Sequence, residues 1–470
     1  MEGTMVERTR SCAKSGLLSK WVDVEELGRL LTLMLPLYIA NLMHIGMGVI
    51  DTIVAGVAGP VELAAVALGT SVTAPIMVAI GAVLTIVGPM VSRMRGAGIE
   101  RQIGLLLNNA KVLALILMVV EALALWGGRY IFPWVTNDPV LAEKAAQYVW
   151  YMILGVPASV LLRAIQGNFE GYGQTRPAMV LSLCGLLLNV PLNYVFVLGK
   201  CGVPALGGAG CGLATAIIHW IMLLGLVLLM FASRQHRQHA RQMVANRRPD
   251  WKLCGRVFHL GLPLGIASMC ELGFFCVAML IIAPLGELMV SAQQVAINVS
   301  GVIFMLPLSL GIAASIRAAY HVGAHRKEAF DSMVRTAMLV TYVLVICVMV
   351  LSMVFRRDIA SLYTDSNEVI ELAQLLILFC AFYQLPDATQ ALFSGLLRGC
   401  HDTRIITWIN LVCYWLVGFP LAYTLVRTDW LIPAMGPAGA WVSFIVALSL
   451  AAALFVWRFV HTRSKSFPTP

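Results

Sequence analysis

Charged side chains are scarce in this chain. Asp, Glu, Lys and Arg together supply 12% of the 470 residues, whereas a soluble domain carries about 25%. Hydrophobic residues supply 59%. This balance excludes an ordinary soluble domain and predicts a polytopic membrane protein.

Motifs for metal, redox or nucleotide chemistry are also missing. The 11 cysteines include no CxxC pair, and no His and Cys residues have zinc-binding spacing. There is no GxxxxGK[ST] phosphate-binding loop, and no loop is long enough for a nucleotide-binding domain. We therefore expect no catalytic residues, no resident metal and no cofactor. The protein is predicted not to be an enzyme, and an ion gradient must drive any transport.

Long apolar runs dominate what is present. A spanning helix needs about 20 apolar residues, and twelve segments qualify. They are roughly residues 30–55, 62–91, 103–126, 146–169, 177–199, 209–232, 257–284, 290–320, 333–355, 370–396, 405–427 and 437–460. The sequence therefore predicts an all-α polytopic membrane protein with twelve transmembrane helices.

Basic residues in the predicted loops and tails account for the net charge of +9, so no nucleic-acid partner is needed to explain it. One side of the membrane receives the N-terminal arginines, Arg93, Arg95, Arg101, Arg176, the run from Arg234 to Lys252, Arg326, Lys327, Arg404, Arg463 and Lys465. The other side receives only Arg129, Lys144, Lys200, Arg356, Arg357 and Arg427. By the positive-inside rule, both termini and the central loop are predicted to be cytoplasmic.

The two halves of the chain repeat each other. Residues 36–98 align with residues 263–325 without a gap, so that Gly96 matches Gly323. Many secondary transporters are built by such duplication, with the substrate site between the repeats. Because each half supplies six helices, we expect two six-helix lobes related by a pseudo-twofold axis along the membrane normal.

The predicted layout has five parts. They are a cytosolic tail at 1–29, an N-lobe at 30–232, a cytoplasmic linker at 233–256, a C-lobe at 257–460 and a cytosolic tail at 461–470. The linker is short, basic and hydrophilic, and it is interpreted as a solvated tether.

Three acids stand out inside the apolar segments. Asp51 lies in the first, Glu271 in the seventh and Asp387 in the tenth. An acid at a helix centre costs roughly 2.5–3.5 kcal/mol on insertion scales, so these residues should face a polar interior. No Lys or Arg is predicted at matching depth, and the nearest candidates, Arg163 and Arg317, lie closer to the cytoplasmic ends. The pattern favours a functional role over a structural ion pair.

Polar residues accompany these acids at helical spacing. Asn41, His44 and Asp51 share one face of the first helix, and Tyr383 precedes Asp387 by one turn. The remaining polar candidates are Asn189, Asn193, Thr215, Gln294 and Asn298. For an isolated Asn, Thr or Gln, an interhelical hydrogen bond is the alternative role.

Several stretches resemble the multidrug and toxic compound extrusion (MATE) family, and its bacterial NorM-like branch in particular. They are GMGVIDTIVAG (46–56), GLLLNVPLNYVFV (185–197), GGAGCGLATAI (207–217), APLGE (283–287) and SGLLRGCHD (394–402). The resemblance runs from about residue 25 to residue 460.

This resemblance implies an inner-membrane antiporter. Family members have twelve helices, alternate between outward-open and inward-open V shapes, and expel small cationic lipophilic drugs in exchange for Na⁺ or H⁺. The implied partners are those drugs and the lipid bilayer. We expect no nucleic acid, no obligate protein partner and a monomer.

The resemblance also implies roles for single residues in the C-lobe. In the NorM-like branch, cation binding is assigned to the acids that match Glu271 and Asp387, with Tyr383 nearby and Gln294 in support. These two acids are candidates to hold Na⁺ transiently. Cation–π contact with aromatic residues such as Phe274 and Phe275 would favour a cationic drug.

An N-lobe site follows from more distant relatives. They build an ion site at the positions that match Asp51, Asn189, Asn193 and Thr215, with an aspartate where this chain has Asn193. This departure removes one negative charge, which predicts weak sodium binding there. Asp51 remains able to carry a proton or contact a drug.

Two other transporter classes are alternatives. A major-facilitator-type drug/H⁺ antiporter also has two six-helix halves, but the loop SRMRGAGIERQ (92–102) lacks that family's DRxGRR-like pattern. A lipid-linked precursor flippase would favour a cavity rich in Arg and Lys. A receptor or structural membrane protein would not explain the buried acids and the repeat.

Overall fold

The computed structural model describes residues 23–136, 138–200, 202–245, 248–430 and 433–467. Every regular element in these ranges is helical. Twelve of the described helices are long and apolar enough to span a membrane, which confirms the prediction of an all-α polytopic fold. Most of the predicted N-terminal tail lies outside the described residues.

The N-lobe and the linker contain the first part of the chain. Their helices are α2 (Val24–Ala58), α3 (Pro60–Leu84), α4 (Val87–Gly96), α5 (Ile103–Gly128), α6 (Phe132–Val135), α7 (Pro139–Gly171), α8 (Arg176–Leu198), α9 (Ala209–Ala232) and α10 (Arg237–Ala245), with a 3₁₀ turn at Glu100–Gln102. Helices α3 and α4 together form the second span.

The C-lobe contains the rest. Its helices are α11 (Trp251–Ile282), α12 (Glu287–Gly323), α13 (Lys327–Val354), α14 (Arg356–Ser361), α15 (Asn367–Gly399), α16 (Arg404–Asn410), α17 (Phe419–Arg427) and α18 (Pro437–Ser466), with a 3₁₀ turn at Ala283–Leu285. A π-helical segment, Leu411–Gly418, joins α16 to α17 within one span.

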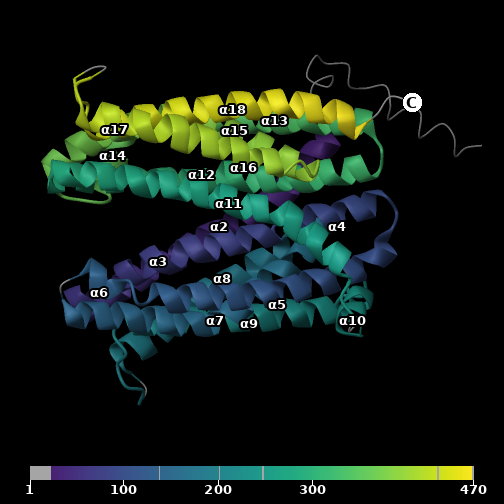
Figure 1. The fold of residues 1–470 in the computed structure, drawn as a ribbon, viewed down its shortest axis with the longest axis horizontal. Helices are drawn as coiled ribbons and strands as arrows, with labels where there is room; N and C mark the ends of the chain where they lie inside the picture. The colour runs from purple at the N-terminus through teal and green to yellow at the C-terminus, as the bar shows by residue number, and fades with distance from the viewer. Residues whose placement is uncertain (1–22, 137, 201, 246–247, 431–432, 468–470) are drawn as a thin grey trace, which may run out of the picture.

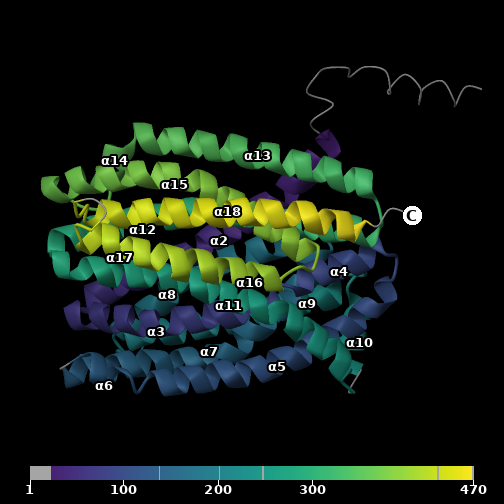
Figure 2. The ribbon, with the colours of Figure 1, turned by 45° about the horizontal axis from the view of Figure 1, so that its top comes forward.

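The spans are grouped into the two predicted six-helix lobes. In Figure 1, most N-lobe helices (purple through blue to teal) lie below the C-lobe helices (teal through green to yellow). Figure 2 shows the same separation after rotation, with α13 at one edge and α5 at the other. The long helices run roughly side by side along the horizontal axis of both views.

The repeat is visible in how the first helix of each lobe begins. Asp23 caps α2 by accepting hydrogen bonds from the backbone N–H groups of Glu25 and Glu26, at 3.0 and 3.3 Å. Asp250 caps α11 in the same way, through the N–H groups two and three residues on, also at 3.0 and 3.3 Å. Such capping satisfies N–H groups that have no partner within the helix.

The lobes meet at the end of the molecule that carries most Lys and Arg side chains, here called the basic end. There the Ser92 hydroxyl on α4 donates a 2.8 Å hydrogen bond to the carbonyl of Ile316 on α12. Glu26 of α2 forms an ion pair with Arg317 of α12. Contacts of this kind hold the two lobes together at the basic end.

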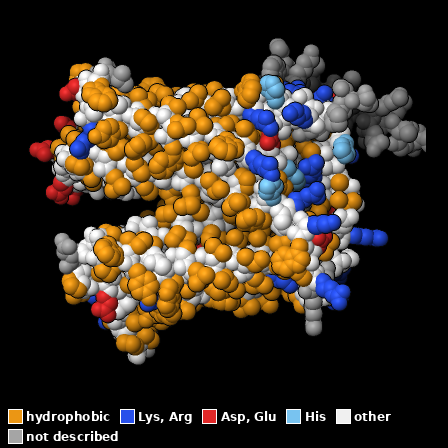
Figure 3. All heavy atoms as spheres, in the orientation of Figure 1, with side chains coloured by type: hydrophobic (Ala, Val, Ile, Leu, Met, Phe, Trp, Pro, Cys, Tyr) orange, Lys and Arg blue, Asp and Glu red, His pale blue; other side chains and the backbone are white. Residues whose placement is uncertain are grey.

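At the opposite end, here called the open end, the lobes separate. Figure 3 shows a cleft between them that opens at the left edge, while the blue Lys and Arg side chains gather at the right. The molecule is therefore a V whose closed point lies at the basic end.

The linker departs from the predicted solvated tether. Within it, His236, His239, Ala240 and Met243 are buried, and the Lys111 ammonium of α5 donates to the carbonyl of Met243 at 2.8 Å. Apolar and aromatic surface on the N-lobe accepts this segment. The interpretation as a free tether was wrong, because it counted the linker's charges and overlooked the apolar side of a short helix.

Candidate functional site

The three predicted acids lie inside the lobes. Asp51 on α2 is 7% exposed, Asp387 on α15 is 2% exposed, and Glu271 on α11 is partly exposed. Among the described residues, no Lys, Arg or His nitrogen lies within 4.0 Å of any of their carboxylate oxygens. None of the three acids is therefore clamped in a structural ion pair.

In the N-lobe, the residues predicted around Asp51 come together from three helices. Asn189 and Asn193, one turn apart on α8, donate side-chain N–H groups to Asp51 Oδ1 at 2.9 and 2.6 Å. The Thr215 hydroxyl on α9 donates to Asp51 Oδ2 at 3.3 Å. The amide oxygens of the two asparagines are buried without a partner. This cluster stabilises a carboxylate with neutral donors and holds no second negative charge.

In the C-lobe, Asp387 and Glu271 are close enough for their charges to interact. The Tyr383 hydroxyl, one turn before Asp387, lies beside its carboxylate, and the Gln390 side chain lies beside Glu271. Asp387 Oδ1 is buried without a hydrogen-bond partner, as is Oε1 of Gln384. The site therefore presents a carboxylate oxygen and an amide oxygen that no protein donor fills.

Aromatic rings form one wall beside this pair. The Phe275 ring lies 6.2 Å from that of Tyr383 and 4.7 Å from that of Phe444, and it is half-buried. Phe274 is 1% exposed and stacks on Tyr414 of the π-helical segment, 5.5 Å away. Of the two predicted drug-contact rings, only Phe275 has free surface in this conformation.

Neither Gln294 nor Asn298 reaches an acid through a hydrogen bond. Both are exposed on α12, and the Gln294 amide donates to the Asn298 side chain at 3.2 Å. The neighbouring Gln293 is fully buried instead and accepts a 2.9 Å hydrogen bond from the Trp441 indole. Trp441 packs edge-on against Tyr383, 5.6 Å away, so Gln293 supports the C-lobe site through that ring.

The two remaining polar residues of α2 have partners in different lobes. The Asn41 amide donates to the Ser309 hydroxyl on α12 at 3.1 Å, so it joins the N-lobe to the C-lobe. His44 lies 3.5 Å from the Ser182 hydroxyl on α8, within the N-lobe.

Two charged residues inside the bundle were not among the predicted site residues. Glu121 of α5 is 1% exposed, and its Oε1 has no hydrogen-bond partner. An acid in the middle of the apolar run 103–126 was a visible signal. Arg398, near the end of α15, interacts electrostatically with Glu170 of the N-lobe and Glu271 of the C-lobe. The prediction that no Lys or Arg lies at matching depth did not consider Arg398, whose interaction with Glu271 is not an ion pair within 4.0 Å.

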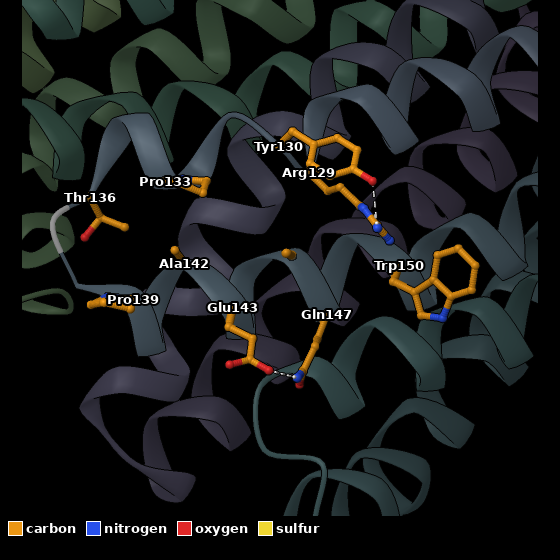
Figure 4. Close-up of a pocket in the computed structure, with 10 residues that line it drawn as sticks. Arg129, Tyr130, Pro133, Thr136, Pro139, Ala142, Glu143, Gln147 and Trp150 are labelled. Carbon is orange, nitrogen blue, oxygen red and sulfur yellow. Dashed lines mark hydrogen bonds between the residues drawn. The ribbon is translucent and has the colours of Figure 1, made fainter.

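A surface hollow at the open end is separate from these acids. It lies between α6 and the start of α7 and is lined by Arg129, Tyr130, Pro133, Thr136, Pro139, Ala142, Glu143, Ala146, Gln147 and Trp150. Figure 4 shows Arg129 bonded to the Tyr130 hydroxyl and Glu143 bonded to Gln147. None of the three acids reaches this hollow, so it is not the candidate site.

Two six-helix lobes around a shared cleft, each with a carboxylate inside it and no ion pair to hold it, define the architecture of an alternating-access membrane transporter. The MatE family model matches residues 36–195 and 263–424, one match in each half. The chain belongs to this family, the MATE family that its motifs resemble, and the major-facilitator alternative is thereby excluded.

Curated relatives match over nearly the whole chain. Multidrug resistance protein MdtK of Yersinia pestis (strain Pestoides F) is 40% identical over 437 residues, which cover 93% of this chain and 95% of the relative. The MdtK protein of Proteus mirabilis (strain HI4320) is 38% identical over 433 residues, covering 91% and 94%.

Solved structures share the fold. The eukaryotic MATE transporter AtDTX14 superposes with a TM-score of 0.84 at 21% identity, covering 94% of this chain and 98% of that one. A multidrug resistance MATE family transporter of the MOP superfamily, in an outward-facing conformation, also gives 0.84 at 18% identity, covering 94% and 97%.

Proposed function

We propose that this protein is a multidrug efflux antiporter of the NorM-like branch. It exports small cationic lipophilic compounds across the bacterial inner membrane in exchange for Na⁺ or H⁺. It acts as a monomer, with both termini in the cytoplasm. The names of its MdtK relatives support multidrug export over a lipid-linked precursor flippase.

One observation carries this proposal: the C-lobe holds two interacting carboxylates, and one of them, Asp387, has a buried acceptor oxygen without a partner. A buried carboxylate without a cation or donor is costly. Asp387 and Glu271 therefore attract a cation to a site that is otherwise lined by apolar side chains. A lipophilic drug cation, Na⁺ and H⁺ can each meet that requirement.

Exchange follows when drug and coupling ion need the same carboxylates. An ion that neutralises Asp387 removes the charge that held the drug. Bound ion therefore lowers the protein's affinity for the drug, and bound drug lowers its affinity for the ion. This coupling is reciprocal because both ligands act on one equilibrium. A guest moves the protein between its open forms only if it binds one form more tightly than the other.

The direction of export depends on which end is cytoplasmic. The basic end carries the Lys and Arg clusters, which the positive-inside rule assigns to the cytoplasm. The cleft then opens away from the cytoplasm, in the state that releases drug and takes up the coupling ion. Closing the open end and separating the contacts at the basic end would return the site to the cytoplasm.

The N-lobe has a different part in this scheme. Its Asp51 is satisfied by three neutral donors from Asn189, Asn193 and Thr215. With no second carboxylate, the N-lobe attracts sodium less strongly than a site with two acids would. We therefore assign the coupling ion to the C-lobe pair.

Transport into everted membrane vesicles tests the proposal. Ethidium accumulation is followed while a sodium gradient and a proton gradient are imposed separately, with vesicles that lack the protein as control. The proposal expects uptake driven by at least one gradient. The absence of protein-dependent uptake under either gradient would contradict it.

A further inference from the structure

Arg163 places a guanidinium group inside the N-lobe. Its side chain is exposed, yet it lies within a spanning helix, about eight residues or 12 Å from the end of α7. Among the described residues, it has no hydrogen bond and no ion pair within 4.0 Å. A guanidinium within a membrane protein is expensive unless it faces polar space or a partner.

The exposed surface of Arg163 faces inward, not toward lipid. The exposed apolar side chains of α7, such as Trp150 and Leu154, form its outer face, and Leu161, which is partly buried, lies on the same face two turns after Leu154. Arg163 lies two residues beyond Leu161, which is about 200° around the helix. The face of α7 that carries Arg163 is therefore opposite the lipid.

The other helices of the N-lobe surround this guanidinium. A Cβ atom built on Gly81 of α3 would lie 3.9 Å from Arg163 Nε. Its electrostatic neighbours come from α2, α5, α7 and α9: they are His44, Glu121, Glu170 and His219. The exposed surface of Arg163 therefore lies among the helices of the N-lobe.

Neither of the carboxylates near Arg163, Glu121 and Glu170, forms an ion pair with its guanidinium within 4.0 Å. Glu121 leaves its Oε1 without a hydrogen-bond partner, although it is buried. Glu170 accepts a 2.8 Å hydrogen bond from Gln166 and shares its charge interaction with Arg398 of the C-lobe. The five N–H donors of Arg163 remain available in a fixed, planar arrangement that suits a carboxylate.

Arg398 also relates this space to the C-lobe acids. Its charge interacts with Glu170, which lies two turns from Arg163 on the same face of α7, and with Glu271. Two turns correspond to about 10 Å along the helix. A chain of charge interactions, from Arg163 through Glu170 and Arg398 to Glu271, thus links the positive group of the N-lobe to the negative pair of the C-lobe.

We propose that Arg163 is an anion-binding subsite that accepts the carboxylate of zwitterionic substrates, while Glu271 and Asp387 hold the amine of the same molecule. This inference deepens the proposed export of cations and rests on it. The two lobes then bind opposite ends of one substrate molecule. A compound with both charges gains a contact that a simple cation lacks.

A matched pair of dyes tests the assignment. A rhodamine that carries a free carboxylate and the methyl ester of the same dye differ only in that negative charge. Their affinities for the purified full-length protein in nanodiscs are measured by fluorescence anisotropy. In Arg163→Gln, the acid dye should lose roughly tenfold more affinity than the ester, as expected for a lost charge-assisted hydrogen bond. An unchanged ratio of the two affinities would overturn the proposal.

Further variants separate binding from a structural role. If Arg163 only neutralises Glu121, then Arg163→Gln combined with Glu121→Gln should restore the wild-type ratio; our proposal expects the ratio to stay low. Arg163→Lys keeps the charge and should retain most of the acid-dye preference, which provides a test if Arg163→Gln does not fold. If the wild-type protein fails to bind even the ester, the proposed export of cations fails instead.

Discussion

Gly96 and Gly323 occupy equivalent positions in the two repeats, and each faces the backbone of the other's helix. A Cβ atom built on Gly96 would overlap the carbonyl oxygen of Tyr320, and one built on Gly323 would overlap that of Arg93. Tyr320 and Arg93 are themselves equivalent in the repeat. The helices α4 and α12 thus cross at a symmetric point where only glycine allows the backbones to approach.

Substitution at this crossing should separate the lobes at the basic end. In Gly323→Ala, the added methyl group has no room, and overpacking typically costs about 1–3 kcal/mol. We expect a longer distance between spin labels at Arg101 and Glu328, which are both exposed at this end. Gly301→Ala on the same helix is the control, because a Cβ there meets nothing within 4 Å. Equal label distances in both variants would contradict the account.

The ion pair between Glu26 and Arg317 should stabilise the closed basic end. Glu26 is 3% exposed, and breaking a buried ion pair costs about 3–5 kcal/mol. Glu26→Gln should therefore lower the thermal unfolding temperature. Its neighbour Glu25 pairs with Arg29 at the surface, with a side chain that is 79% exposed, so Glu25→Gln should change stability by no more than about 1 kcal/mol. Similar effects of the two substitutions would show that the buried contacts of Glu26 with Arg317 and His321 add nothing.

Docking of the linker should depend on pH. Burial, followed by the charges of His239 and Arg95, lowers the pKa of His236 from 6.5 to about 4. The folded state therefore holds the neutral ring, which accepts from Asn168 at 3.1 Å and donates to Gln174 at 2.9 Å. The stability contributed by His236 is fully present above pH 6.5 and is lost as the pH falls toward 4.

Hydrogen exchange over residues 234–245 measures this effect. Amide protection, corrected for the intrinsic exchange rate, should fall as the pH drops through this interval. His461→Gln, at an exposed position on α18, should leave the profile unchanged. Protection that stays constant down to about pH 4 would refute the role of His236.

Restoring a second acid to the N-lobe should create a sodium site. Asn193 Nδ2 lies 2.6 Å from Asp51 Oδ1, so Asn193→Asp places two carboxylates in contact, and their repulsion favours a bound cation. The variant should gain thermal stability on addition of Na⁺ but not of an equal concentration of choline. Both this variant and its reference protein should carry Asp387→Asn, which removes the proposed C-lobe ion site. A sodium response of the same size in the reference protein, which keeps Asn193, would contradict the weak N-lobe site assigned here.

The twelve spans could be predicted because apolar run length is a local property of the sequence. The N-lobe cluster was also predictable, since Asn189 and Asn193 are one helical turn apart and matched a family pattern. The choice between Gln293 and Gln294 was not, because adjacent helical residues point about 100° apart and only packing decides which faces the core. The same ambiguity separates the buried Phe274 from the half-buried Phe275.

Charges that act between segments were harder to predict. Arg398 lies near the end of an apolar run, where an arginine usually reaches water. Its interaction with Glu170 and Glu271 depends on how the two lobes meet. Linker burial similarly depends on an N-lobe surface that is distant in the sequence.

Competition between drug and coupling ion at Asp387 tests the central claim most directly. Ethidium binding to the purified protein is titrated at rising Na⁺ and at falling pH, for the wild-type protein, for Asp387→Asn and for the control Asp331→Asn, whose acid pairs with Arg463 at the basic end. We predict that at least one ion weakens ethidium binding to the wild-type protein and to Asp331→Asn. In Asp387→Asn, binding should already be weaker by roughly tenfold, about 1.4 kcal/mol, and should no longer respond to that ion. Tight, ion-sensitive binding by a well-folded Asp387→Asn protein would contradict the account.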